Sequence, residues 1–578
     1  MANLFNSIRV RPPKHNRFNL SHDVKLTAKF GKSTPILIQD VLPGDVFKLR
    51  SEVLCRFAPM LAPIMTKVNV YTHFFFVPKR LVWDSWKDFI TGGEDGVSSP
   101  SYPRIRLMSS SVVSDSPTRR LFYSGTLADY LGFPVLGEGK GIYPGRVYDL
   151  DALPFRAYQL IWNEYYRDQN LMDPIDIMKD SDGPVVLGTS GEQSEHIIDL
   201  MTLRDRCWKK DYFTSALPWA QRGDEVELPL MFGSDVEFTG ENGVNSVGLQ
   251  GPGLSYLKGA VPDDYQTHSL EAKRTSPNTW RMLRQGDEAN PVYLSNQNTS
   301  TTSPDNSVYV NLTIDKLNQL VKGLNLSNAS SATINELRRA IKAQEFLEVA
   351  ARGGSRYIEQ IYSYFGVRSS DARLQRPEFL GGGKSPVVVS DVLQTSQSTE
   401  TSAQATPSGH AISVQNSHSF KYRAEEHGYI IGIMSIMPNA AYMQGLPRMY
   451  QKFDRLDHYW PQFAHLGEQE IKTSELFSDA SLKENTDDKT FGYTPRYAEY
   501  KFAQDSIHGD FRNSLSFWHM ARIFENAPAL NPEFLTNVQD AANRVFNVVN
   551  DDVDKIWINI HHNLKALRKM PKYGTPLF

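Results

Sequence analysis

Alternating apolar and polar residues mark the first strands of the chain. Val24, Leu26, Ala28 and Phe30 are separated by polar residues, which is the period of a β-strand with one buried face. The alternation returns over residues 68–77, where apolar and aromatic side chains occupy both faces. A strand that is apolar on both faces lies in the middle of a sheet or between two layers. We therefore predict β-structure in the first third of the chain and a central place for 68–77.

Two segments show the period of an amphipathic helix. Residues 153–171 place an apolar stripe on one side, and the stripe consists of Phe155, Tyr158, Ile161, Trp162 and Tyr165. A second helix follows Thr333, which forms a capping box with Glu336 in the first turn, and Gly353 with Gly354 ends it.

Further strands are predicted over 308–314, 410–423 and 429–437, and we find no internal repeat. Strands that are scattered along the chain and separated by very long connections favour an antiparallel barrel over a βαβ repeat. Two stretches differ from the rest in composition. Residues 232–307 are rich in Gly, Asn, Ser, Thr, Asp and Pro, and residues 394–408 are a polar, low-complexity loop. We expect 232–307 to be a surface insertion and a site of external contact.

Composition narrows the class of protein. The 578 residues carry 62 basic and 65 acidic side chains, a formal charge of -3, so the chain as a whole is not a nucleic-acid condenser and any genome contact must be local. Its two cysteines, Cys55 and Cys207, are far apart and form no CxxC pair, which argues against a disulfide framework or a thiolate zinc site. We predict neither a signal peptide nor a membrane span.

The sequence contains no complete catalytic motif. Gly381–Ser385 reads GGGKS, but Glu378 stands where a phosphate-binding loop has its first glycine, and a strand signal follows instead of a helix. We therefore predict a turn there. His561 and His562 are adjacent and would point to different sides of a helix, which disfavours a metal site. No catalytic, cofactor-binding or metal-binding residue is predicted, and the chain is not expected to be an enzyme.

Basic residues gather at both ends of the chain. Residues 1–32 are expected to form an extended basic arm that contains seven cations and one acid, Asp23. The candidate nucleic-acid contacts are Arg9, Arg11, Lys14, Arg17, Lys565, Arg568, Lys569 and Lys572. Such side chains can neutralise phosphates without reading sequence. Charged termini can equally be solvated and disordered, or can clamp a neighbouring subunit, and the sequence leaves the three alternatives open.

The block 203–223 combines aromatic and basic side chains. It is a candidate subunit interface or genome-facing segment, and the residues concerned are Arg204, Arg206, Trp208, Lys209, Lys210, Tyr212, Phe213 and Trp219. Aromatic residues dominate interfaces and cores alike, so ordinary core packing is the alternative.

Long ordered blocks of the chain resemble the major capsid proteins of the Microviridae, particularly the gokushovirus branch. The blocks are VLPGDVFKLR (41–50), 60–93, LPFRAYQLIWNEYYRDQNL (153–171), LRDRCWKKDYFTSALPWAQRG (203–223), 336–383 and GYTPRYAEYKFAQDSIHGDFR (492–512). The resemblance spans nearly the full length.

The resemblance implies an all-β core, an eight-stranded antiparallel jelly roll with long loop and helical insertions over 33–578. It further implies a T=1 icosahedral virion shell around circular single-stranded DNA, assembled in the cytoplasm of a bacterial host. Residues 232–307 would form protrusions at the threefold axes that contact a host surface receptor. The implied partners are further copies of the chain, an internal scaffolding protein, a DNA pilot protein and a small DNA-binding protein. No membrane is expected among the partners.

Two other classes of protein compete with this interpretation. Jelly rolls also host carbohydrate-binding and hydrolytic proteins, although no pair of carboxylates stands out as a glycosidase site. A minor virion component, such as a spike or pilot protein, is the second alternative. Copy number in purified particles separates a shell protein from a minor component.

Overall fold

The fold is described from a computed structural model, and the chain divides into two compact units. One unit contains residues 1–222 and 348–578, and the other contains residues 223–347. The structure describes residues 14–94, 96–107, 120–137, 140–141, 148–187, 192–223, 231–236, 270–276, 279–284, 287–295, 324–330, 334–354, 356–393, 407–478, 489–548, 550 and 553–573.

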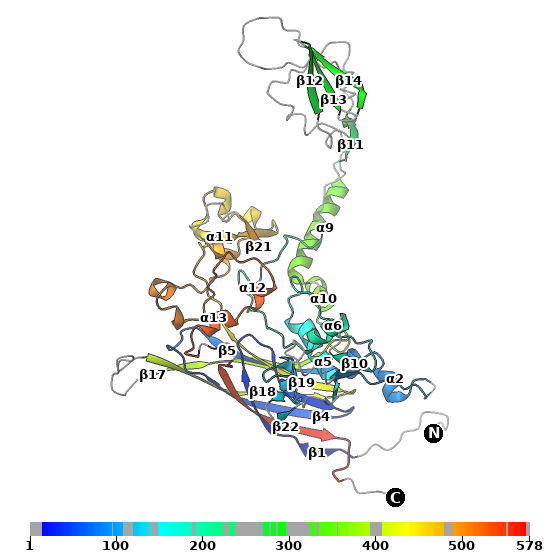
Figure 1. Cartoon of the computed structure of the whole chain (residues 1–578), viewed down its shortest axis with the longest axis vertical. Coiled ribbons are helices and arrows are strands. Elements are labelled where there is room, and N and C mark those ends of the chain that lie inside the picture. The colour runs from blue at the N-terminus through cyan, green and yellow to red at the C-terminus, as the bar shows by residue number, and fades with distance from the viewer. Residues whose placement is uncertain are drawn as a thin grey trace. The chain divides into compact units, whose positions relative to one another are not determined.

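Two antiparallel sheets form the centre of the first unit (Figure 1). The larger sheet has the order β1-β22-β4-β18-β17, and β2 also pairs with β22. Its strands are β1 (Asn16–Asn19), β2 (His22–Ala28), β4 (Val46–Phe57), β17 (Val388–Leu393), β18 (Pro407–Arg423) and β22 (Ile556–Arg568). The smaller sheet has the order β16-β5-β19-β3. Its strands are β3 (Thr34–Val41), β5 (Val68–Pro78), β16 (Glu378–Pro386) and β19 (Gly428–Pro438).

Eight of these strands are divided equally between the two sheets, and successive strands lie in opposite sheets except for β5 and β16. Taken in chain order, they are β2, β3, β4, β5, β16, β18, β19 and β22. The larger sheet joins the first, eighth, third and sixth of them, and the smaller sheet joins the second, seventh, fourth and fifth. Most of the remaining chain of this unit lies in two connections, which run from β5 to β16 and from β19 to β22.

The main hydrophobic core lies between the two sheets. Phe47, Leu49 and Phe57 from the larger sheet meet Phe74 and Phe76 from the smaller one, and all five are buried. Residue alternation explains this, because every second side chain of β4 points into the sandwich. Most side chains buried between the sheets are apolar or aromatic, with Ser51 and His562 among the polar exceptions, so burial of apolar surface is the main stabilising contribution of the fold.

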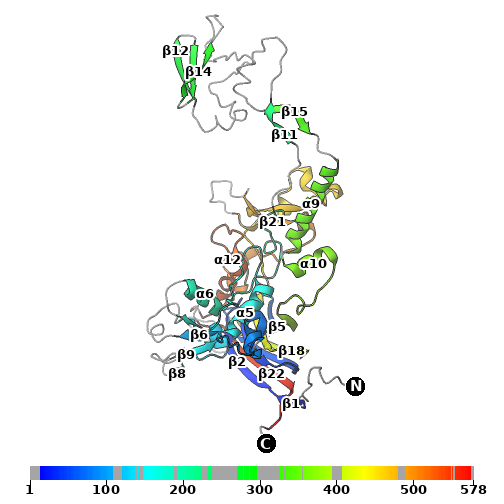
Figure 2. The same ribbon diagram turned by 90° about the vertical axis from the view of Figure 1, so that its right-hand side faces the viewer.

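A second core covers the opposite face of the smaller sheet. Phe75 and Val77 of β5 pack there with residues of α5 (Leu153–Ile161), among them Phe155 and Tyr158. Figures 1 and 2 show α5 on one side of the sandwich and β1 with β22 on the other. The predicted central place of 68–77 is confirmed, because β5 pairs on both edges and both its faces are covered.

Shorter elements fill the two connections of the first unit. The helices are α1 (Lys79–Val82), α2 (Trp86–Thr91), α4 (Leu127–Tyr130), α6 (Glu192–Met201), α10 (Tyr357–Phe365), α11 (Thr473–Leu476), α12 (Pro532–Thr536) and α13 (Gln539–Asn543). The strands are β6 (Arg104–Leu107), β7 (Leu136–Gly137), β8 (Lys140–Gly141), β9 (Tyr148–Asp151), β10 (Pro184–Leu187), β20 (Glu468–Lys472) and β21 (Thr490–Pro495). The π-helix η2 (Trp162–Tyr166) continues α5. The short 3-10 helices η4 (Arg448–Tyr450), η5 (Arg455–Asp457), η6 (Pro461–Phe463), η8 (Ala498–Tyr500), η9 (Gly509–Arg512) and η10 (Ser516–Trp518) complete the unit. The predicted antiparallel sheets are confirmed, but the chain as a whole mixes strands and helices.

The second unit contains the predicted insertion 232–307. Its described strands are β11 (Met231–Val236), β12 (Leu270–Ser276), β13 (Thr279–Arg284), β14 (Asp287–Ser295) and β15 (Leu324–Ser330). They form one three-stranded and one two-stranded antiparallel sheet. Helix α9 (Ile334–Gly353) begins in this unit and stops at the predicted glycine. Thr333, the strand predicted over 308–314 and residues 394–406 of the polar loop lie outside the described residues.

Two local predictions were wrong. The GGGKS segment is not a turn but part of β16, paired with β5. Its glycines meet a packing need, because a Cβ on Gly382 would lie 2.6 Å from the carbonyl oxygen of Thr72. His561 and His562 belong to strand β22 and not to a helix, so they point to opposite faces of a sheet.

Candidate genome-contact and assembly surfaces

The fold brings the basic residues of the two chain ends together. Strand β1 pairs with the end of β22, so that Arg17 lies opposite Leu567 and Asn19 lies opposite Lys565. Arg17 is exposed and Lys565 is half-buried. The segment expected to be an arm therefore contains β1 and β2 of the larger sheet, whereas Arg9 and Arg11 lie outside the described residues and Lys14 is exposed. Sequence reasoning did not anticipate this pairing, because it joins residues more than 500 positions apart.

Arg568 holds the end of β22 against the sheet. Its Nε lies 3.1 Å from Oδ2 of Asp45, and its Nη2 donates to the carbonyl oxygen of Asp40 at 2.7 Å. Burial raises the pKa of the Asp45 carboxyl, although Arg568 favours its charged form. This arginine is committed to the subunit, whereas Lys569 and Lys572 are exposed beyond the strand.

Three aromatic residues of the block 203–223 are buried inside the subunit. Trp208 lies in the core between the sheets, 2% exposed, and its Nε1 donates to the carbonyl oxygen of Asn537 at 3.1 Å. Tyr212 donates to Glu475 at 2.9 Å, and Phe213 packs edge-on against Tyr442. These side chains have no surface left for a neighbouring subunit, so core packing accounts for them.

The two arginines of the block also bind within the subunit. Arg206 donates from Nη1 to Oγ of Ser435 at 2.6 Å, and its guanidinium lies 4.2 Å from the ring centroid of Tyr71. Burial lowers the pKa of Arg206. Arg204 donates from Nε to Gln159 of α5 at 3.1 Å. Both side chains thus attach the segment to the sandwich and to its helical cover.

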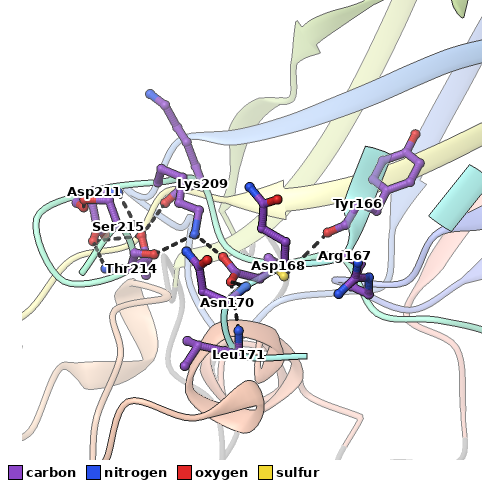
Figure 3. A network of polar contacts seen from close by, with 12 residues as sticks. Tyr166, Arg167, Asp168, Asn170, Leu171, Lys209, Asp211, Thr214 and Ser215 are labelled. Carbon is purple, nitrogen blue, oxygen red and sulfur yellow. Dashed lines mark hydrogen bonds and ion pairs between the residues drawn. The ribbon is translucent and has the colours of Figure 1, made fainter. Parts of the chain in front are cut away.

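The lysines that follow lie in a polar network beside the turn after α5 (Figure 3). Lys210 donates to Oδ2 of Asp168 at 2.5 Å and to the carbonyl oxygen of Thr214 at 3.0 Å. Thr214 in turn donates to the carbonyl oxygen of Lys209 at 2.9 Å. The network orders the loop, while Lys209 and Lys210 stay exposed and Trp219 is half-buried. Of the block, these three remain available for contact with another molecule.

A surface that the sequence did not single out lies in residues 446–466. This stretch of short turns exposes eight large apolar side chains: Leu446, Met449, Tyr450, Phe453, Leu456, Tyr459, Trp460 and Leu466. Phe453 is 90% exposed. An exposed concentration of apolar residues marks a contact surface. The signal was missed because these residues follow neither a helical nor a strand period.

Within the described ranges, no three His, Cys, Asp or Glu side chains gather as metal ligands would. None of the helices drawn from those ranges combines the length and apolar character needed to cross a bilayer. Both cysteines are free thiols, and burial raises the pKa of Cys55 to about 12 and that of Cys207 to about 11.

Comparison with known proteins shows the family of the chain. Residues 8–578 match the family model described as capsid protein (F protein). The chain belongs to this phage capsid protein family. It is 34% identical to capsid protein VP1 of Chlamydia phage 1, over 100% of this chain and 98% of the relative. It is 33% identical to capsid protein VP1 of Bdellovibrio phage phiMH2K and 29% identical to that of Spiroplasma virus 4, in both cases over 97% of this chain and 95% of the relative.

Family membership confirms the resemblance to the Microviridae and makes this chain a structural virion protein, not an enzyme. A capsid protein of this family acts as a homo-oligomeric shell.

Proposed function

We propose that the chain is the major coat subunit of a T=1 icosahedral shell around a circular single-stranded DNA genome. The observation that carries the proposal is the strand order of the two sheets, β2-β22-β4-β18 and β3-β19-β5-β16, which is the order that two Greek keys produce. That order supports an eight-stranded jelly roll. Because β2 supplies the first of the eight strands, we place the start of the capsid domain at His22 instead of residue 33.

Assembly requires surfaces that copies of the chain bury against one another. The 446–466 surface is our candidate, because a closed shell sums many individually weak apolar contacts. The segment is held in place from within, because Lys452 lies 2.8 Å from Glu499 and 3.8 Å from the ring centroid of Tyr500, and both charged side chains of this ion pair are at least 90% buried.

The second unit supports a separate role in host contact. It is inserted between two segments of the first unit and contains the polar stretch 232–307. We propose that 232–307 forms protrusions at the threefold axes and binds a host receptor. Long polar insertions on a rigid scaffold commonly carry such contacts. An internal scaffolding protein, a DNA pilot protein and a small DNA-binding protein complete the proposed set of partners, with assembly in the bacterial cytoplasm.

Electron microscopy of the full chain, expressed with its scaffolding protein, tests the proposal. We expect uniform small icosahedral particles in which this chain is the dominant protein band. Deleting 232–307 is expected to leave the particles closed, to remove their surface protrusions and to abolish adsorption to the host. A chain that stays monomeric with scaffold present, or that is scarce in purified particles, contradicts the proposal.

A further inference from the structure

The two sheets of the sandwich differ in how they are covered. The smaller sheet has a packed core on both faces, whereas the larger sheet buries the inner face and exposes the outer one. Along β4, for example, Lys48, Arg50 and Arg56 are exposed between buried neighbours. A sheet face left open in a subunit is available to a partner.

This outer face is strongly basic, although the whole chain is slightly acidic. Its exposed or half-buried basic residues are Arg17, Lys25, Lys48, Arg50, Arg56, Lys421, Arg423 and Lys565. The acidic residues on the same face are Asp23 and Glu52, and both are engaged. Asp23 lies 2.6 Å from His561, and Glu52 lies 3.7 Å from Arg50. A local excess of positive charge on a near-neutral protein is the electrostatic pattern of a polyanion site.

Strand register concentrates three lysines in one row across this face. Lys48 of β4 pairs with Lys421 of β18 on one side and with Lys565 of β22 on the other. Directly opposite residues of an antiparallel pair have Cβ atoms about 5 Å apart, and like charges there destabilise the sheet. Among the residues that the structure describes, none of the three forms an ion pair. A row that repels itself in the subunit is neutralised when a polyanion binds over it.

An aromatic platform lies on the same face. Trp557 is 48% exposed and pairs with Arg56 on one side and Thr27 on the other. It lines a hollow of about 1180 Å³ together with the cations Lys25, Lys29 and Arg56. Two carboxylates, Asp129 and Asp554, also line this hollow, and Asp554 accepts a hydrogen bond from the Thr27 hydroxyl. Exposed aromatic rings beside cations bind single strands, because any unpaired base can stack on them while phosphates meet the charges.

We propose that the outer face of β22, β4 and β18 binds the genome. The Lys48, Lys421 and Lys565 row neutralises the phosphates of single-stranded DNA, and a base stacks on Trp557. Binding is independent of sequence, since the row offers point charges and no groups arranged to read base edges. The inference rests on the proposed function, because it needs a shell subunit that encloses single-stranded DNA. An acidic protein segment is the alternative occupant, and the test below separates the two.

The test uses the full chain in which all three lysines of the row are changed to glutamine (Lys48→Gln, Lys421→Gln and Lys565→Gln). The matched control removes the same charge elsewhere, at three exposed lysines (Lys67→Gln, Lys87→Gln and Lys179→Gln). Binding to a thymidine 30-mer is measured by fluorescence anisotropy as salt is varied. We expect the row variant to bind about tenfold more weakly and the slope of log affinity against log salt to fall by about 2, at about 0.7 per lost phosphate contact on a single strand. The control should match the parent chain.

A second variant examines the platform. Trp557→Leu is expected to weaken binding severalfold while leaving the salt slope unchanged, because stacking releases no counterions. DNA content per particle should fall in both the row variant and the Trp557 variant, with closed shells retained. Closed shells with unchanged oligonucleotide affinity would overturn the inference and leave the proposed function intact. Unchanged affinity together with lost scaffold binding would assign the face to an acidic protein partner, and absence of shells from the parent chain would refute the proposed function itself.

Discussion

His562 of β22 donates a hydrogen bond from Nε2 to the carbonyl oxygen of Ile36 in β3, at 3.0 Å, and thereby joins the two sheets of the sandwich. On the other side of the ring, Nδ1 accepts from Oγ of Ser51 at 2.8 Å. A carbonyl oxygen can only accept, so Nε2 carries the proton. Nδ1 then accepts from the serine hydroxyl, as it does in the neutral imidazole. The ring is fully buried, and burial lowers its pKa to about 4.

Subunit stability should therefore depend on this histidine in mildly acidic solution. In the unfolded chain His562 binds a proton near pH 6.5, whereas in the folded chain it stays neutral until about pH 4. Its contribution is complete above pH 6.5 and is lost as the pH falls from 6.5 to 4, by up to about 3 kcal/mol. Urea unfolding of the subunit between pH 4 and 7 measures this slope. His562→Gln should flatten it and His561→Gln, on the exposed face, should not; equal slopes for all three chains would contradict the prediction.

The burial of Trp208 predicts a defect in folding, not in assembly. Trp208→Ala removes a large side chain from the core between the sheets and leaves the Asn537 carbonyl without its donor, at a cost of about 3–5 kcal/mol in the free energy of unfolding. Lys209→Ala, at the exposed neighbouring position, should change it by less than about 0.5 kcal/mol. Chemical denaturation of the subunit compares them. If Trp208→Ala unfolded like the parent chain but no longer assembled, the interface interpretation of this residue would be restored.

Loss of Phe453, the most exposed aromatic side chain among the residues that the structure describes, should impair assembly and not folding. Phe453 is 90% exposed, so Phe453→Ser is expected to leave subunit unfolding within about 0.5 kcal/mol of the parent chain. It should still reduce the yield of closed shells, because the side chain is buried by another copy in the proposed assembly. Val97→Ser, at a residue that is 82% exposed outside the 446–466 surface, is the control. Normal shell yield from Phe453→Ser, measured by sedimentation, would remove this segment from the interface.

Neutralising the N-terminal basic residues distinguishes genome contact from clamping of a neighbouring subunit. We expect simultaneous replacement of Arg9, Arg11, Lys14 and Arg17 by glutamine to leave shells intact while DNA per particle falls, since phosphate contacts contribute to packaging and not to subunit contacts. Particle counts by microscopy and DNA absorbance in the same preparation measure both quantities. Loss of shells without a specific loss of DNA would mean that the segment clamps a neighbouring subunit.

Local sequence was sufficient where a single element carries its own pattern. The double-sided apolar run 68–77 predicted a central strand because side-chain alternation is a property of the strand itself. The end of α9 at Gly353 was also predictable from local sequence, because glycine readily adopts the backbone conformation that ends a helix. The aromatic block at Trp208 could be recognised as important, but nothing within it distinguished core from interface.

The tertiary structure decided the relationships that depend on which strands pair and in what register. The sequence predicts a turn at GGGKS, because the neighbour that requires glycine at Gly382, Thr72, is more than 300 residues away. The row of Lys48, Lys421 and Lys565 could not be foreseen either, since each lysine looks like an ordinary solvated charge on its own strand. Alternation along a strand is set by covalent geometry and is visible in the sequence, whereas pairing across a sheet is set by long-range packing, and a shift of one residue would move the whole row to the opposite face.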